Sequence, residues 1–282
     1  MMRPLTPILL AIFCAGIAAA DDVTRLEIID ARQVTRPVIC CLSGVDTDAG
    51  GRVVLVSDRG FRFDAGLDSE MSSLIITQSL NLSETGGTPT SLDWIDAEGL
   101  AVANDGRIFI SFERQHRITE YQATRALSSW AAPDFITLPS NGGMEALALD
   151  VSGTLWALPE TPVEGSFALL ALADGVWERR GLLEQTDGYL PVGADFDAIG
   201  RLYVLERDRW LLSFRSRVRR INNPMASSLD IETLWESDYG EYDNLEGIAV
   251  LDGDRHSPRL LLISDDNQRS FQETQAIIVH LD

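Results

Sequence analysis

The sequence predicts an all-β protein, a single β-propeller of five or six blades. Three observations predict it: an internal repeat, the spacing of its turn glycines, and the lack of a long amphipathic helical pattern. Each repeat reads as a short apolar strand, a polar turn with glycine, a second apolar strand and a terminal acidic residue. The repeats span 43–59, 95–114, 142–161, 190–207 and 243–267. The alternative is a β-sandwich whose hairpins resemble one another by chance.

The elements of the repeat fit propeller blades one by one. The turn glycines Gly51, Gly106, Gly153 and Gly200 lie 55, 47 and 47 residues apart, close to the length of a four-stranded blade. The second strands, such as 107–112 and 201–205, are almost continuously apolar, as expected when both faces pack against neighbouring sheets. A closed ring protects its strand edges. We therefore predict that 26–29 and 276–281 complete the same blade.

Residues 1–20 have the pattern of a secretory signal peptide. Arg3 precedes an apolar run over 8–17 and the small residues 18–20, the order typical of such peptides. We expect cleavage after Ala20, a periplasmic or secreted protein, and one propeller domain over 21–282. No later segment has 18 consecutive apolar residues, so we expect no membrane span.

Charge and composition exclude several classes of function. The formal net charge is −20, and all 23 basic residues are arginine. Such an acidic surface repels nucleic acid and anionic lipid, and the lack of lysine excludes Schiff-base and P-loop chemistry. Three histidines and no G-x-S-x-G motif argue against a histidine metal site and a serine triad. We expect a monomer that binds a small phosphoester or another anionic ligand.

The adjacent pair Cys40 and Cys41 remains after the predicted cleavage. Neighbouring cysteines cannot crosslink distant segments, so this is not a disulfide-stabilised scaffold. A strained vicinal disulfide is one interpretation. Two buried thiols are the favoured one.

Carboxylates recur at equivalent positions of the repeats. Glu98, Glu145 and Glu246 open the first strands of their hairpins, and the first strand of a propeller blade lines the central channel. Acids gathered there must be protonated, paired with arginine or bound to a cation. In an exported protein, Ca²⁺ is the natural ion for oxygen ligands.

A second polar set lies where the second strands end. It comprises Asp58-Arg59, Glu113-Arg114, Glu206-Arg207 and Asp265-Asp266. The acids could hold a metal ion and the guanidinium groups a phosphate; alternatively, these pairs only tie blades together. Arg215, Arg217 and Arg219 share one strand face, either solvated or forming an anion-binding edge.

These motifs resemble the family called esterase-like activity of phytase, or phytase-like. The likeness rests on SGV…LVSDRG, DAEGLA…DGRIFISFER, GGMEALA, GRLYVLER, SRVRRI and DNLEGIAV…LLLISDDNQ, in order from Ser43 to Leu281. It implies an exported propeller with phosphoester or esterase chemistry. The family's acids fall on Asp58, Glu98, Glu113, Glu145, Glu206, Glu246, Asp265 and Asp266. The chain departs from the pattern at Gly44-Val45, at Leu158-Pro159-Glu160 and after Asp266.

The leading hypothesis is an exported, Ca²⁺-dependent phosphoester hydrolase. Glu98, Glu145 and Glu246 would be catalytic and would hold the metal with Asp58, Asp265 and Asp266, while Arg59, Arg114 and Arg207 would bind the phosphate. The alternative is a non-catalytic propeller that binds a ligand or protein and uses its acids for structural metal or inter-blade pairing. Carboxylester hydrolysis is a third candidate.

Overall fold

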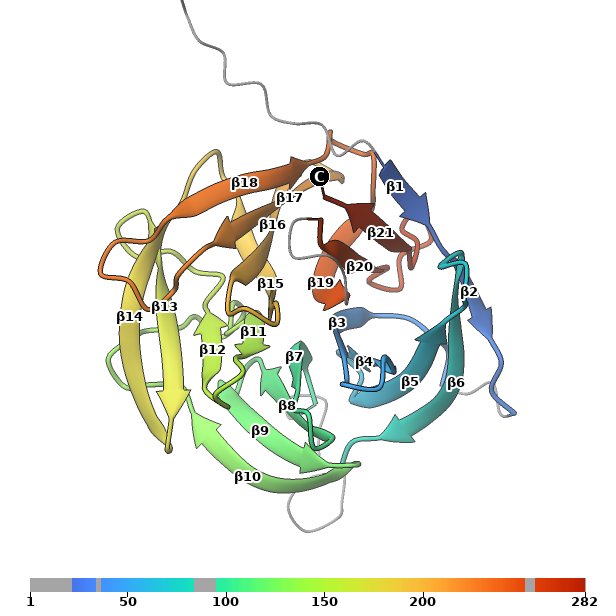
Figure 1. The fold of residues 1–282 in the computed structure, drawn as a ribbon, viewed down its shortest axis with the longest axis horizontal. Helices are drawn as coiled ribbons and strands as arrows, with labels where there is room; N and C mark the ends of the chain where they lie inside the picture. Colours follow the sequence, from blue (N-terminus) through green and yellow to red (C-terminus); the bar gives the residue numbers. More distant parts are fainter. Residues whose placement is uncertain (1–21, 34–36, 84–94, 252–256, 282) are drawn as a thin grey trace, which may run out of the picture.

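The computed structural model describes residues 22–33, 37–83, 95–251 and 257–281, which form five β-sheets arranged in a ring around a central axis (Figure 1). The all-β propeller prediction is confirmed, and the number of blades is five. In every blade the first strand of the repeat lies innermost. The innermost strands of neighbouring blades contact one another around the axis, β3 against β7 and β19 against β3 among them.

Each of the first four blades contains four consecutive antiparallel strands. The first contains β3 (Leu42–Thr47), β4 (Val53–Ser57), β5 (Phe61–Leu67) and β6 (Ser73–Asn81). The second contains β7 (Ala97–Val102), β8 (Arg107–Phe112), β9 (Arg117–Gln122) and β10 (Arg125–Ala131). The third contains β11 (Ala146–Leu149), β12 (Leu155–Leu158), β13 (Ser166–Ala173) and β14 (Val176–Glu184). The fourth contains β15 (Leu190–Phe196), β16 (Leu202–Trp210), β17 (Ser213–Ile221) and β18 (Ile231–Glu236).

The fifth blade combines both ends of the described chain. It contains β19 (Asn244–Leu251), β20 (Arg259–Asp265), β21 (Ala276–His280) and, outermost, β1 (Asp22–Arg25), which pairs antiparallel with β21. The predicted closure is thus confirmed, but the N-terminal strand was assigned four residues too late. Segment 26–29 instead crosses to the first blade, where β2 (Glu27–Asp30) pairs in parallel with β6.

The core is divided into clusters at the seams between blades. Along β8, Ile108 and Ile110 pack toward the first blade, whereas Phe109 packs toward the third. Both faces of the strand are therefore buried, which explains why the second strands of the repeats are almost continuously apolar. The seams fix the blades relative to one another, and hence the ends of the inner strands.

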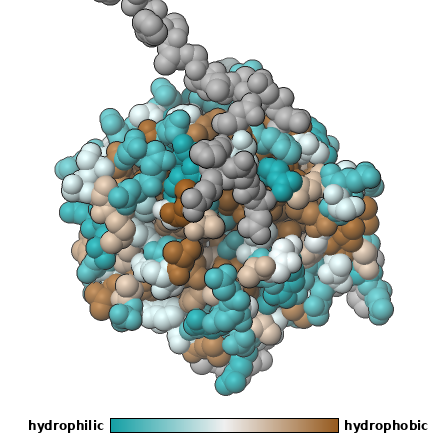
Figure 2. All heavy atoms as spheres, viewed as in Figure 1, coloured by the Kyte–Doolittle hydropathy of each residue, from teal (hydrophilic) through white to brown (hydrophobic). Residues whose placement is uncertain are grey.

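The outer surface is more polar than these seams. The face seen along the axis is largely hydrophilic at its rim, with scattered apolar residues (Figure 2). Within the described ranges, no helix is long and apolar enough to cross a membrane. The predicted signal peptide, residues 1–20, lies outside the described residues.

Candidate functional site

The predicted acids converge at the end of the axis where the inner strands begin. Glu98 lies at the start of β7, Glu145 directly precedes β11, and Glu246 lies near the start of β19. Glu98 and Glu246 occupy β-bulges, where the pairing with the next strand is interrupted. A bulge redirects a side chain. The carboxylates of Glu98 and Glu246 therefore do not follow the regular alternation of side chains between the two faces of the sheet.

Glycines next to these positions let the inner strands approach closely. A Cβ atom on Gly99 would lie 2.5 Å from the backbone oxygen of Glu145, and one on Gly193 would lie 2.6 Å from that of Glu246. Both distances are to backbone atoms, which cannot move aside as a side chain can. Gly99, in the Glu-Gly motif, and Gly193, which follows Val192, thus let the inner strands of neighbouring blades approach closely.

The carboxylates at this mouth perturb one another strongly. We call the following set the acid ring: Asp58, Asp96, Glu98, Glu113, Glu145, Glu160, Glu246 and Asp265. Burial, and then Glu145 and Glu246, hold the pKa of Glu98 well above its usual value. Burial, and then Glu160, Glu113 and Glu246, raise the pKa of Glu145 to about 8. Glu98 is also hydrogen-bonded to Glu145, so one of these two carboxyl groups carries a proton when no cation is present.

The strand-end acids extend the acid ring. Burial, and then Glu246, Asp58 and Asp266, raise the pKa of Asp265 to about 8. The pKa of Asp58 rises to about 6, mainly through burial, with Arg59 opposing the shift. Sequence reasoning expected such a gathering of acids; the catalytic and metal-binding roles assigned to them stay predictions.

Two members of the acid ring were not predicted as site residues. Oxygens of Asp96, Glu98 and Glu113 lie within 4.8 Å of one another. Asp96 lies in the second repeat, but Gly143 and Asn244 stand at the same distance before Glu145 and Glu246, so the repetition did not mark it. Glu160 accepts a hydrogen bond from Nη2 of Arg207 at 3.1 Å. Glu160 occupies the same position in its repeat as Glu113 does, and this equivalence was the available signal. It was not predicted as a site residue because no arginine follows it.

The predicted phosphate-binding arginines already have carboxylate partners. Arg207 donates to Glu246, Glu160 and the Asn244 amide. Arg114 Nε lies 2.7 Å from Asp96, and Arg59 Nε lies 3.3 Å from Asp58. The Arg114 and Arg59 side chains remain 47% and 42% exposed, so an entering anion could reach them without displacing buried groups. A role in phosphate binding stays a prediction.

Glu206 does not belong to the acid ring. Its fully buried carboxylate accepts hydrogen bonds from Nε of Arg217 and Nε of Arg219, both at 2.6 Å. Both alternatives for the face of Arg215, Arg217 and Arg219 are therefore wrong, because Arg217 and Arg219 are buried partners of Glu206. Arg215 binds Asp208 at 3.0 Å.

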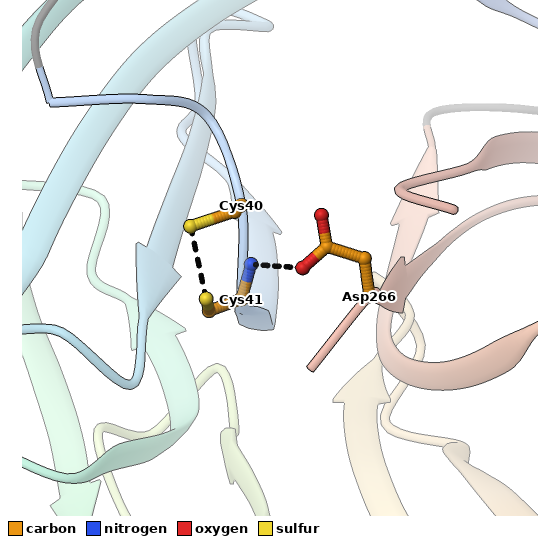
Figure 3. A group of neighbouring side chains, drawn as sticks. All are labelled: Cys40, Cys41 and Asp266. Atoms are coloured by element: carbon orange, nitrogen blue, oxygen red, sulfur yellow. Dashed lines mark hydrogen bonds between the residues drawn. The ribbon is translucent and has the colours of Figure 1, made fainter. Parts of the chain in front are cut away.

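Asp266 lies beside the acid ring. Its Oδ1 accepts the N–H of Cys41 at 3.3 Å (Figure 3). The same oxygen accepts the N–H of Gln268 at 3.0 Å, and Oδ2 accepts the Thr274 hydroxyl at 3.0 Å. These bonds orient the loop after β20. Its predicted role as a metal ligand stays a prediction.

The residues of the acid ring fit a small hard cation. Oδ1 of Asp58 is buried and receives no hydrogen bond from the described residues, although Arg59 Nε lies 3.3 Å from it. A void of about 10 Å³, with room for roughly one water-sized species, lies beside Glu246 and is otherwise lined by Ser43, glycines and apolar residues. The available ligands are carboxylate oxygens, the type that Ca²⁺ prefers.

A cavity of about 610 Å³ opens at the opposite end of the axis. Two of the buried acids in its lining, Asp46 and Asp195, were not predicted. Each bridges two blades: Asp46 accepts the N–H of Val102 at 2.5 Å, and Asp195 accepts that of Val250 at 2.6 Å. These contacts give the two acids a structural role. The convergence of acids predicted from the repeat lies at the other mouth.

Comparisons with known proteins agree with this architecture. A gluconolactonase from Xanthomonas campestris superposes with a TM-score of 0.51 at 16% identity, over 86% of this chain and 72% of that one. The PQQ-bound aldose sugar dehydrogenase from Streptomyces coelicolor gives 0.50 at 14%, over 93% and 98%. Hydrazine synthase from Kuenenia stuttgartiensis gives 0.47 at 12%, over 80% of this chain and 65% of that chain. At these identities the likeness concerns the fold alone.

Sequence comparison gives a more specific result. No curated protein matches the chain significantly. The family described as esterase-like activity of phytase (phytase-like) matches residues 39–268, a region that holds every member of the acid ring. Since this match covers well over half of the sequence, the protein belongs to the phytase-like family, esterase-like activity of phytase.

Proposed function

We propose that the protein is a Ca²⁺-dependent phosphoester hydrolase whose metal and substrate meet at the acid ring. The observation that carries the proposal is the gathering of Glu98, Glu145 and Glu246, from three blades, at one mouth of the axis. Membership of the phytase-like family supports a hydrolase. A bound Ca²⁺ would neutralise the negative charge of the ester and lower the pKa of a bound water.

The protein's own residues would prepare this site in three ways. The proton held between Glu98 and Glu145 would leave when both carboxylates become ligands. Arg207 and Asn244, which both bind Glu246, would keep that carboxylate turned toward the axis. Arg59 and Arg114, half-exposed beside the ring, would bind the phosphate oxygens from the solvent side.

The test uses purified protein with aryl phosphomonoesters and phosphodiesters, each with Ca²⁺ and with a chelator. Glu98→Gln removes a charge from the acid ring and should abolish metal-dependent turnover. Glu178→Gln is the matched control, since Glu178 lies 54% exposed on the outermost strand of its blade, and it should keep wild-type rates. If the chelator leaves turnover unchanged and the Glu98→Gln variant is still active, the proposal is rejected.

The second candidate is a non-catalytic propeller that binds a ligand or a protein partner. It is favoured by the internal pairing of arginine with carboxylate, as in Arg207 with Glu246 and Glu160. Under this candidate, Ca²⁺ would serve stability, and a chelator would lower the melting temperature although no substrate turns over. Carboxylester hydrolysis is tested in the same assay with aryl acetates.

We also propose that the protein is exported and acts as a monomer on a small anionic ligand. The support for export is the signal-like pattern of residues 1–20, and the support for an anionic ligand is the half-exposed pair Arg59 and Arg114. N-terminal sequencing of protein from the periplasm or medium should begin at Asp21. Recovery of uncleaved protein in the cytoplasm would contradict export, and light scattering gives the oligomeric state.

A further inference from the structure

The two cysteines are placed for chemistry with each other. They lie in the segment that enters β3, and the Cys41 thiol donates to the Cys40 sulfur across 2.9 Å (Figure 3). A disulfide bond is about 2.05 Å long, so the sulfurs need to approach by less than about 1 Å. Cys41 is fully buried, whereas Cys40 is half-buried. Cys41 is therefore the more enclosed residue of the pair, and Cys40 the one nearer to the solvent.

The surrounding residues hold this arrangement. Cys41 has a φ of 58°, in the left-handed region that costs free energy for residues other than glycine. Its N–H donates to Asp266 Oδ1, and its carbonyl accepts the N–H of Asp58 at 3.0 Å. Gln268 Nε2 lies 3.6 Å from the Cys40 sulfur. Contacts from the loops after β4 and β20 thus fix the backbone at which the two sulfurs meet.

The pair is also connected to the acid ring. The Cys41 thiol interacts with the Asp58 carboxylate and with the Arg59 guanidinium. Asp58 is a member of the acid ring, and Asp266 follows another member, Asp265. A change in the bonding of Cys41 therefore alters the surroundings of Asp58 directly.

We propose that Cys40 and Cys41 form an oxidisable dithiol that closes reversibly to a vicinal disulfide and thereby changes the cation affinity of the acid ring. Its oxidant is a small or protein disulfide of an oxidising compartment. The dithiol itself is independent of the proposed function. The effect on cation affinity rests on that function.

The reaction balances as two exchanges with one disulfide, RSSR. The Cys40 thiolate attacks one sulfur of RSSR, which forms a mixed disulfide on Cys40 and releases one RS⁻. The Cys41 sulfur, lying 2.9 Å away, then attacks the Cys40 sulfur and releases the second RS⁻. The two cysteine protons end on the two RSH products, so both cysteines are oxidised and RSSR is reduced.

The same geometry makes the bond easy to reopen. Adjacent Cα atoms lie about 3.8 Å apart across a trans peptide, below the roughly 4.4–6.8 Å usual for disulfides. A strained disulfide has a more oxidising potential and is the labile kind. The pair therefore suits reversible modification better than permanent crosslinking.

The first experiment treats the full chain with oxidised glutathione and maps the thiols by mass. Tryptic peptide 33–52 contains Cys40 and Cys41 and no other cysteine. In wild-type protein its mass should fall by about 2 Da, the two hydrogens lost on closure, without a retained glutathione. In Cys41→Ser the same peptide should keep glutathione on Cys40, because the resolving sulfur is missing. A wild-type peptide that stays reduced, or that accumulates the adduct, would overturn the proposal.

The second experiment titrates Ca²⁺ by calorimetry into the reduced and oxidised forms. Closure removes the Cys41 S–H, which is shared between the Cys40 sulfur and the Asp58 carboxylate, and so frees that carboxylate. The oxidised form should therefore bind with a Kd lower by on the order of tenfold, the equivalent of one hydrogen bond to a charged group. Equal Kd values would refute the link between the dithiol and the acid ring. Absence of Ca²⁺ binding in both forms would reject the proposed function, while the mass experiment still decides whether the dithiol closes.

Discussion

Replacing Glu206 with glutamine should destabilise the fourth blade severely. The Glu206 side chain is fully buried, and its partners Arg217 and Arg219 are only 5% and 7% exposed. The amide keeps the shape but removes the negative charge and turns N–H groups toward guanidinium donors. Leaving buried charge without its partner costs about 3–5 kcal/mol. For a domain of this size, that predicts a fall in Tm of roughly 6–20 °C.

The neighbouring strand pair offers a matched control. Arg220 donates to Glu232 at 2.6 Å, with the Glu232 side chain 52% exposed, and exposed ion pairs contribute about 0–1 kcal/mol. Urea and thermal unfolding of Glu206→Gln and Glu232→Gln, measured side by side, compare a buried and an exposed partner of the same strand, β17. If the two variants lose equal stability, the reasoning from burial is refuted.

Two further predictions concern the acid ring. Because the pKa values of Glu145 and Asp265 lie at about 8, the folded state binds more protons than the unfolded state from about pH 5 to 8. The stability of the metal-free protein should therefore fall as the pH rises through this range. Ca²⁺ should raise the Tm more at pH 8 than at pH 5. A Tm that scanning calorimetry finds independent of pH would contradict this. Gly99→Ala forces a Cβ against the Glu145 backbone and should lower the free energy of unfolding, measured in urea, by about 1–3 kcal/mol. The control is Gly66→Ala, which has open space at its Cβ and should change the free energy of unfolding by less than about 1 kcal/mol. Equal losses would show that the close approach of the strands is unimportant.

Much of the fold could be predicted from the sequence because the repeat is regular. Every repeated hairpin forms the inner half of one blade, and the almost continuous apolar strands lie buried at both faces, as β8 illustrates. The equivalent offsets of Glu98 and Glu145 placed both side chains at the same mouth. Equivalent residues of successive repeats lie at the same height in successive blades. The convergence of these acids on the axis could therefore be predicted from their spacing in the sequence.

Other contacts of the site depend on side-chain packing, which the spacing of residues in the sequence does not reveal. Glu206 occupies a strand-end position like that of Glu113, yet Arg217 and Arg219 neutralise it within its own blade. Asp96 directly precedes β7 and joins the acid ring beside Glu98 and Glu113. The N-terminal strand was assigned four residues too late, since 22–25 and 27–30 both read as short strands.

The crossing of the chain from β1 to β2 has a consequence for how the ring assembles. Asp22 pairs with His280, while Glu27 pairs with Ser73, so one short segment belongs to the last blade and to the first. Its contact with β21 joins positions that are almost a full chain length apart, and such long loop closures are slow. The N-terminal segment can complete its sheet only after the C-terminal strand has been synthesised. The closure of the ring through β1 is consequently a late event in folding, and until then the edge of β21 lacks its outer partner, whereas β2 can already pair with β6.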